Sequence, residues 1–215
     1  MNNSDFDVNN HLPLVAIIRG VLPKDVIRVA QILIEEGFSM IEVPLNSPNA
    51  LDSIKQLVES FGRDYFVGAG TVTTAEQAKE VIKTGANLVV TPNHNEEVIK
   101  LAVQANCVVF PGVVTPTEAF SAVALGATGV KLFPISMLGL DGFKALKSVL
   151  PKGAICLPVG GIEPTVKSMK PLMDIGAQGF GLGSSLYIPD MEDDELRYNA
   201  KAFVDAFHVI KQLSI

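Results

Sequence analysis

The 215-residue sequence contains no tryptophan and only two cysteines. Both cysteines, Cys107 and Cys156, lie inside apolar, strand-like runs, which favours buried thiols in a reducing cytoplasm over a disulfide scaffold. No apolar run approaches the ~20 residues that a membrane span requires. The polar stretch Met1–Asn10 lacks the basic and apolar regions of a signal peptide. We therefore expect a cytoplasmic protein.

Positive charge is also scarce: 17 Lys and Arg against 23 Asp and Glu give a formal net charge of -6 at pH 7. This balance argues against a nucleic-acid or anionic-membrane partner, although a local site for a small anionic substrate is compatible with it. His11, His94 and His208 are scattered and show no metal-ligand spacing. The sequence has no Ser-His-Asp, CxxC or Walker pattern, so we expect neither a metal nor another cofactor.

What the sequence does contain is a regular alternation of short apolar runs with segments that repeat apolar residues at helical spacing. The eight runs are Leu14–Arg19, Met40–Leu45, Phe66–Thr71, Leu88–Pro92, Val108–Val113, Gly129–Pro134, Ala154–Gly160 and Gly179–Gly183. They are continuous rather than alternating, as in a parallel sheet that is covered on both faces. Eight such units predict a single-domain (β/α)8 TIM barrel over residues 12–215, after a flexible N-terminal tail at residues 1–11.

Helix-start chemistry supports this alternation. Thr74 stands three residues before Gln77, the spacing of a capping box. Thr115 and Pro116 open another helix-like segment, with Glu118 behind them.

Two of the runs carry an ionisable residue. Lys131 lies in the middle of the sixth run and Glu42 lies in the second. Because alternate strands share layers inside a barrel, both side chains can point into one interior. One interpretation is a buried structural ion pair, which would add little net stability. The other is a lysine whose pKa is lowered by burial, so that its neutral amine attacks a ketone while Glu42 acts as acid and base.

In such barrels the active site lies where the strands end, and the polar and glycine-rich residues there are few. Arg19 ends the first run and can grip a carboxylate or phosphate, although a solvated arginine is an equal alternative. Thr71 ends the third run. Gly160 and Gly161 end the seventh, and Gly183 with Ser184 ends the eighth. Glycines of this kind let backbone N–H groups approach an anion, or they form tight turns.

Six motifs at these positions resemble those of one family. The motifs are Ile17–Gly20, Glu42–Pro48, Gly68–Val72, Lys131–Pro134, Val159–Gly161 and Gly181–Tyr187. Over residues 12–187 the chain resembles the 2-keto-3-deoxy-6-phosphogluconate/-galactonate aldolases, which are class I aldolases, (β/α)8 barrels and usually trimers. The resemblance implies that Lys131 forms the Schiff base and that Glu42 is the general acid/base. It further implies that Arg19, Thr71 and Gly160 contact the substrate, with Gly161, Gly183 and Ser184 at its phosphate end.

Two positions suggest which branch of the family the chain resembles. Asn46 stands where phosphogluconate-type enzymes usually have an arginine, and Val159 where they usually have a threonine. The resemblance therefore implies cleavage of 2-dehydro-3-deoxy-6-phosphogalactonate to pyruvate and glyceraldehyde 3-phosphate by a homotrimer in sugar-acid catabolism. The gluconate epimer, or both epimers, is the nearest alternative. A phosphosugar isomerase or epimerase, and a non-catalytic phosphosugar-binding barrel, are more distant ones.

Overall fold

The computed structural model describes residues 1–8 and 10–213. The strands are β1 (Leu14–Ile17), β2 (Met40–Pro44), β3 (Phe66–Gly70), β4 (Leu88–Val90), β5 (Val108–Phe110), β6 (Gly112–Val113), β7 (Val130–Leu132), β8 (Cys156–Pro158) and β9 (Phe180–Leu182). The α-helices are α1 (Val26–Glu35), α2 (Ala50–Phe61), α3 (Ala75–Lys83), α4 (Glu96–Gln104), α5 (Pro116–Ala124), α6 (Ile135–Val149), α7 (Val166–Ile175) and α8 (Asp193–Leu213). A short 3-10 helix, η1 (Asn3–Asp5), precedes them. In the described part of the chain, no helix has the length and apolar composition of a membrane span.

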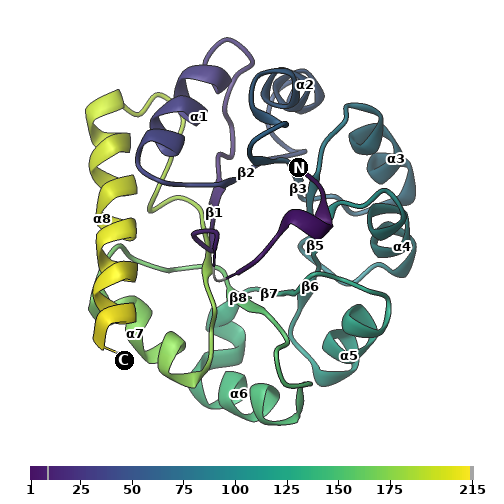
Figure 1. Cartoon of the computed structure of the whole chain (residues 1–215), viewed down its shortest axis with the longest axis vertical. Helices are drawn as coiled ribbons and strands as arrows, with labels where there is room; N and C mark the ends of the chain where they lie inside the picture. The colour runs from purple at the N-terminus through teal and green to yellow at the C-terminus, as the bar shows by residue number, and fades with distance from the viewer. Residues whose placement is uncertain (9, 214–215) are drawn as a thin grey trace.

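The strands form two parallel sheets that continue into one another. One sheet has the order β5-β4-β3-β2-β1-β9 and the other the order β6-β7-β8. At one junction β5 runs into β6 through Pro111, and at the other a parallel bridge joins Val159, just after β8, to Gly181 of β9. The helices surround the strands when the molecule is viewed down its short axis (Figure 1). The predicted α/β alternation is confirmed as a curled parallel sheet with helices outside it.

The fifth predicted strand, Val108–Val113, is divided in the structure because it contains Pro111. Proline has no backbone N–H and cannot donate to a neighbouring strand. Its carbonyl still accepts a hydrogen bond from the backbone N–H of Lys131 at 2.8 Å. The two residues after Pro111 form β6, in which Gly112 pairs with Lys131. The division therefore fixes the backbone on one side of this lysine.

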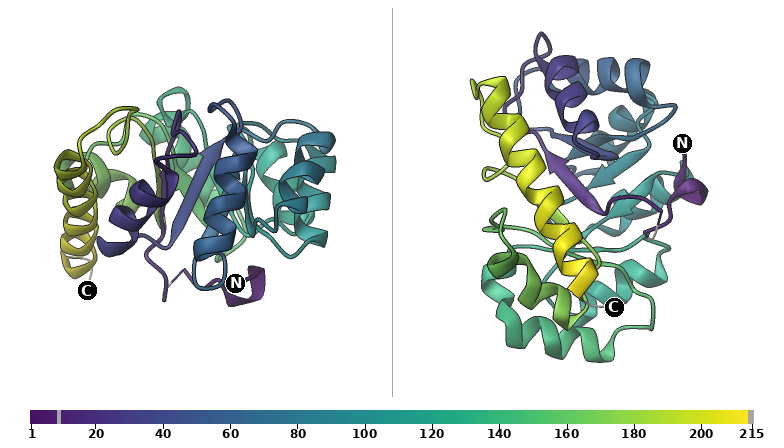
Figure 2. Two further views of the ribbon diagram at one scale, coloured as in Figure 1. Left: turned by 90° about the horizontal axis from the view of Figure 1, so that it is seen from above. Right: turned by 60° about the vertical axis from the view of Figure 1, so that its left-hand side comes forward.

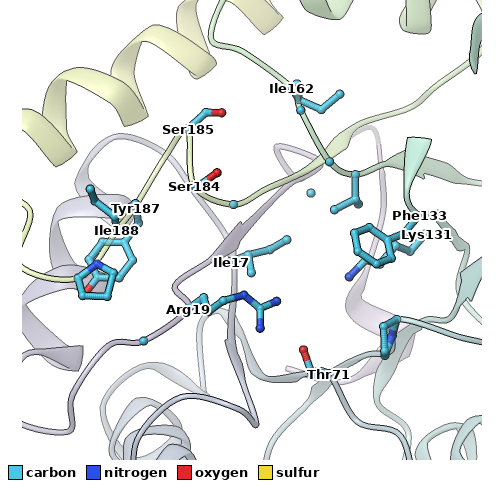
Figure 3. Close-up of a pocket in the computed structure, with 18 residues that line it drawn as sticks. Ile17, Arg19, Thr71, Lys131, Phe133, Ile162, Ser184, Ser185, Tyr187 and Ile188 are labelled. Atoms are coloured by element: carbon cyan, nitrogen blue, oxygen red, sulfur yellow. The ribbon is translucent and has the colours of Figure 1, made fainter. Parts of the chain in front are cut away.

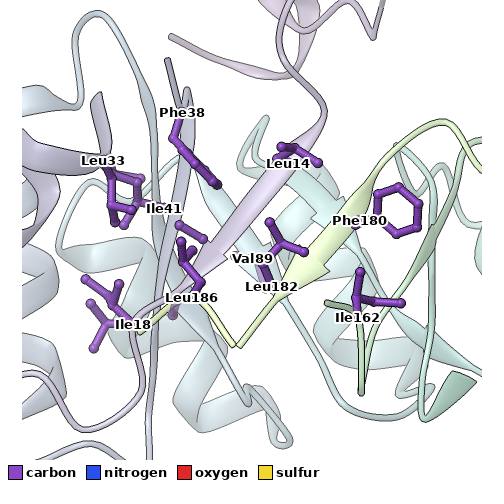
Figure 4. Close-up of a cluster of buried hydrophobic side chains, with 14 of the residues drawn as sticks. Leu14, Ile18, Leu33, Phe38, Ile41, Val89, Ile162, Phe180, Leu182 and Leu186 are labelled. Carbon is purple, nitrogen blue, oxygen red and sulfur yellow. The ribbon is translucent and has the colours of Figure 1, made fainter. Parts of the chain in front are cut away.

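Successive strand residues face opposite sides of the sheet, even though the strands are buried on both sides. The larger apolar cluster lies between the helices and the sheet; Figure 4 shows Leu33 of α1 and Phe38 near Ile41 of β2. A smaller cluster fills the interior of the curled sheet. Its buried members are Val15, Met40, Phe66, Leu88, Val90, Val108, Phe110 and Leu157. Because Met40 faces inward and Ile41 outward, Glu42 faces the same interior as Met40.

The first residues of the chain pack against this interior cluster. The Phe6 ring lies edge-on to Phe66 and Phe110, with ring centroids 5.6 and 5.9 Å apart, and His11 lies edge-on to Phe66 at 5.2 Å. The backbone N–H of Asn3 donates to the carbonyl of Asn106, which lies shortly before β5. Figure 2 shows this segment at one end of the molecule. These contacts differ from the loose tail expected for residues 1–11, and they cover the end at which the strands begin.

The predicted helix starts are confirmed. Thr74 accepts a hydrogen bond from the backbone N–H of Gln77, and the Gln77 side chain accepts one from the backbone N–H of Thr74. Thr115 and Glu118 form the same reciprocal pair at the start of α5. Both capping boxes lie at the edge of the sheet where β3 and β6 end, so they fix the loops that follow these strands.

Candidate active site

Glu42 is buried in the interior of the curled sheet, with 1% of its surface exposed. Its Oε2 atom has no hydrogen-bond partner among the residues that the structure describes. Burial raises the pKa of the Glu42 carboxyl to about 7, and the nearby charges of Lys131 and Arg19 oppose this rise. A carboxyl that titrates near neutral pH can both donate and accept a proton, as general acid/base catalysis requires.

Lys131 lies on β7 and enters the same interior, with 6% of its surface exposed. Burial lowers the pKa of its amine; Glu42 opposes this effect and Arg19 adds to it. Its Nζ lies 4.8 Å from the centroid of the Phe133 ring. Among the described residues no ion pair joins Lys131 to Glu42 or to any other carboxylate. The two groups therefore influence each other's pKa without forming the direct ion pair considered above.

A cavity of about 380 Å³ opens at the end of the sheet where the strands finish. Figure 3 shows Lys131 and Phe133 on one side, Ser184 and Ser185 on another, and the Arg19 side chain pointing into the space between them. The predicted substrate-binding residues that line it are Arg19, Thr71, Gly160, Gly161, Gly183 and Ser184. The structure thus brings these six positions together from the ends of four strands, β1, β3, β8 and β9.

Below this cavity lies a second, smaller one, which is lined by Glu42. Its other walls are mainly apolar and include Val15, Val90 and Leu157. Lys131 borders both cavities. The amine therefore lies between an outer space, which is large enough for a small ligand and has Arg19, Thr71 and Ser184 among its lining residues, and an inner, apolar space that holds the carboxylate. An apolar surround of this kind strengthens electrostatic interactions by excluding water.

The loop after β2 holds the loop after β1. The Arg19 guanidinium donates a hydrogen bond from Nη1 to Oδ1 of Asn46. The next residue, Gly20, donates its backbone N–H to Oγ of Ser47 at 2.9 Å. Asn46 does not line the outer cavity, so it acts on the cavity through Arg19, whereas Val159 lines the cavity directly.

Thr71 has a backbone conformation that is unusual for its residue type. Its φ of 57° lies in the left-handed region, which β-branched residues rarely adopt. Such a conformation costs on the order of 1–3 kcal/mol and is found most often at functional sites. It turns the chain directly after β3 and leaves the Thr71 hydroxyl on the wall of the outer cavity (Figure 3).

Three glycines form the wall on the far side from Thr71. Gly160 and Gly161 have φ values of 104° and 71°, which favour glycine. A Cβ on Gly161 or Gly183 would meet no atom of the described residues within 4 Å, so these positions are open to the cavity. The turn after Gly183 is closed by the backbone N–H groups of Leu186 and Tyr187, which both donate to the Gly183 carbonyl. Backbone this open lets N–H groups approach an anionic ligand.

Several cavity residues were not predicted as site residues. Phe133, Ile162, Tyr187 and Pro92 line the outer cavity. Phe133 and Tyr187 lie within two of the six motifs, Lys131–Pro134 and Gly181–Tyr187, and this position is the one feature of the sequence that could have indicated them as site residues. In the residues that the structure describes, no group of three or more His, Cys, Asp or Glu side chains is arranged to hold a metal ion.

The family is shown by comparison with known proteins. The family model described as KDPG and KHG aldolase matches residues 7–197. This chain belongs to the KDPG and KHG aldolase family. The resemblance drawn from the six motifs is thereby confirmed, and the matched segment contains both Lys131 and Glu42.

Individual members of the KDPG and KHG aldolase family are similar over nearly the whole chain. A protein of Rhizobium meliloti (strain 1021), named probable 2-dehydro-3-deoxy-6-phosphogalactonate aldolase, is 42% identical over 198 residues, 92% of each chain. The 2-dehydro-3-deoxy-6-phosphogalactonate aldolase of Escherichia coli (strain K12) is 41% identical over 196 residues, 91% of this chain and 95% of its own. A solved structure described as native KDPGal superimposes with a TM-score of 0.90 at 40% identity, over 94% of this chain and 97% of that one.

Proposed function

We propose that this protein is a class I aldolase that cleaves 2-dehydro-3-deoxy-6-phosphogalactonate to pyruvate and D-glyceraldehyde 3-phosphate. The observation that carries the proposal is the buried pair of Lys131 and Glu42, whose pKa values are displaced toward neutrality beneath an open cavity. The names of the relatives described above support the same substrate.

In the proposed mechanism the neutral amine of Lys131 attacks the C2 ketone. Glu42 relays protons as the carbinolamine loses water and becomes an iminium. Glu42 then removes the proton of the C4 hydroxyl, the C3–C4 bond breaks, and the iminium takes up the electron pair as an enamine. Glyceraldehyde 3-phosphate leaves, C3 of the enamine is protonated, and hydrolysis releases pyruvate and the free amine of Lys131.

The outer cavity offers groups for both anionic ends of this substrate. We assign Gly161, Gly183 and Ser184 to the phosphate, because the two glycines are open to the cavity and Ser184 lines it beside them. Arg19 and Thr71 contact the substrate from the side nearer to the strands β1 and β3. Gly160 belongs to the same wall as Gly161.

Borohydride trapping with pyruvate tests the mechanism. Reduction of the imine leaves a stable mass gain, and peptide mass spectrometry is expected to locate it on Lys131. The Lys131→Met variant is the matched control and should gain no mass. A folded wild-type protein that forms no adduct would contradict the aldolase assignment and favour the isomerase or epimerase alternative, which needs no imine.

The choice of C4 epimer rests on Asn46 and Val159, which we propose as specificity residues. Asn46 holds Arg19, and Val159 lines both cavities. The galactonate epimer is expected to have the higher kcat/KM, and Val159→Thr is expected to reduce the preference. Equal kcat/KM values for the two epimers would identify a dual-epimer enzyme, and the reverse order a phosphogluconate aldolase.

We also propose that the curled sheet is a closed (β/α)8 barrel and that the enzyme is a cytoplasmic homotrimer. The bridge between Val159 and Gly181 supports closure. Large exposed apolar side chains support assembly: Phe120 on α5 is 44% exposed and Met137 on α6 is 74% exposed. Light scattering that reports the 22.9 kDa mass of one chain would contradict the trimer.

A further inference from the structure

The Glu42 carboxylate lies against Gly70 of the neighbouring strand β3. A Cβ added to Gly70 would lie 1.2 Å from Oε2 of Glu42 and 2.1 Å from its Cδ. The three nearest atoms to that Cβ all belong to the Glu42 carboxylate. In the strand register Gly70 pairs with Pro44, two residues beyond Glu42, so the Glu42 side chain leans along its strand toward the outer cavity. The carboxylate thus occupies the volume that any other residue at position 70 would need.

The backbone does not itself require glycine at this position. Gly70 lies in a regular strand and does not have the positive φ seen at Gly160 or Gly161. Gly68, in the same strand, differs: its Cβ would lie 2.0 Å from the backbone carbonyl oxygen of Leu88. A side chain at Gly68 would therefore disturb the sheet, whereas a methyl group at Gly70 meets first the end of a flexible side chain.

In the described structure no hydrogen bond or ion pair holds Oε2 of the Glu42 carboxylate. Within residues 1–8 and 10–213 this atom has no hydrogen-bond partner, and no ion pair joins Glu42 to Lys131 or Arg19. The position of the carboxylate is therefore set by packing: Gly70 lies against it on one side, and the apolar wall of the inner cavity and Lys131 lie on the others.

We propose that Gly70 is a positioning residue for proton transfer, because its missing side chain provides the slot that orients the Glu42 carboxylate toward the imine on Lys131. The inference rests on the proposed aldolase function. An alanine at position 70 displaces the carboxylate by rotation of the Glu42 side chain and leaves Lys131 and the outer cavity in place. Misplacement of a catalytic group by about 1 Å can reduce a rate by roughly 10²-fold. We expect a loss of about this size in kcat for Gly70→Ala, with little change in KM.

A double-mutant cycle with Gly70→Ala, Glu42→Ala and the double variant tests the proposal. In the wild-type background Gly70→Ala should lower kcat by about 10²-fold and lower the urea midpoint of unfolding. In the Glu42→Ala background it should do neither, because the methyl group enters the volume that the carboxylate has vacated. Equal effects of Gly70→Ala in both backgrounds, on either readout, would overturn the proposal, as would a wild-type kcat for Gly70→Ala alone.

Two controls separate this proposal from others. Gly142→Ala on α6 also sets a methyl group beside a flexible side chain, with Cδ1 of Leu138 at 3.2 Å from the added Cβ, and should leave kcat unchanged. Borohydride trapping of pyruvate on Lys131 should persist in Gly70→Ala, although more slowly because Glu42 relays protons during imine formation, and it should persist likewise in Glu42→Ala, because neither change displaces the lysine. Absence of trapping in the wild-type protein would refute the aldolase function, whereas its absence in Gly70→Ala but not in Glu42→Ala would show that Gly70 supports Lys131 rather than Glu42.

Discussion

The Glu42→Gln substitution is expected to stabilise the protein at neutral pH while slowing cleavage. Glutamine has nearly the same size as glutamate but does not ionise. Burial raises the pKa of the Glu42 carboxyl from 4.5 to about 7, so the folded state holds this proton more tightly than the unfolded state. The stability that the protonated carboxyl contributes is present below pH 4.5 and is lost as the pH rises through 7.

The magnitude follows from the same values. At about 1.36 kcal/mol for each pH unit, the interval from 4.5 to about 7 corresponds to about 3 kcal/mol. Wild type and Glu42→Gln should therefore be similarly sensitive to urea near pH 4.5, and the variant should gain up to about 3 kcal/mol over wild type by pH 8. Loss of the Glu42 charge also lowers the pKa of Lys131 further. A lysine whose pKa is lowered in the folded state makes the protein more stable as the pH rises. The changes at Glu42 and at Lys131 therefore both increase the stability of the variant relative to wild type with rising pH.

The assay is urea unfolding of both proteins between pH 4.5 and 8, at one protein concentration because assembly affects apparent stability. Lys131→Met provides a comparison, since it removes the cation that opposes the raised pKa of Glu42 and should move the fall in stability to higher pH. A difference between wild type and Glu42→Gln that does not change with pH, or that favours wild type at pH 8, would refute the reasoning.

Three further predictions concern packing and thiol chemistry. Asn87→Leu should lower the free energy of unfolding by about 2–3 kcal/mol in urea titrations, because the Asn87 side chain accepts from the backbone N–H of Val67 at 2.7 Å and donates to the carbonyls of Gly62 and Tyr65. Phe6→Ala should lower it by about 1–3 kcal/mol while kcat is retained, since Phe6 packs at the end of the sheet opposite the outer cavity; a loss of activity at full folding would contradict this placement. Burial raises the pKa of the Cys107 thiol to about 11, so disulfide reagents at pH 8 should label it only after unfolding.

Much of the fold and of the candidate site was visible in the sequence because the relevant signals are local. Continuous apolar runs separated by capped helices predicted the order of strands and helices. Lys131 and Glu42 stood out because a charged residue inside an apolar strand has few structural uses. Strand ends converge at one edge of a parallel sheet, so Arg19, Thr71 and the glycines were predicted to meet before their contacts were known.

The features that the sequence did not predict depend on contacts between distant residues. Pro111 divides a run that reads as one strand, because its effect depends on which neighbour requires a backbone N–H. Phe6 and His11 belong to a polar segment, and their contacts with Phe66 of β3 and Phe110 of β5 become visible only in the fold. In the sequence Gly70 is an ordinary glycine at the end of a strand, because its contact with the Glu42 carboxylate depends on the pairing of two strands.

The arrangement of two cavities joined at Lys131 has a consequence for altering this enzyme by directed evolution. Thr71, Ile162 and Ser184 line the outer cavity but do not border the inner one. These positions can therefore be varied in a mutant library without changing the residues around the Glu42 carboxylate. Val159 borders both, and changes there alter recognition and reactivity together. Variants that accept new aldehydes are therefore best sought by first changing residues that line only the outer cavity, while the residues that line the inner cavity are kept unchanged.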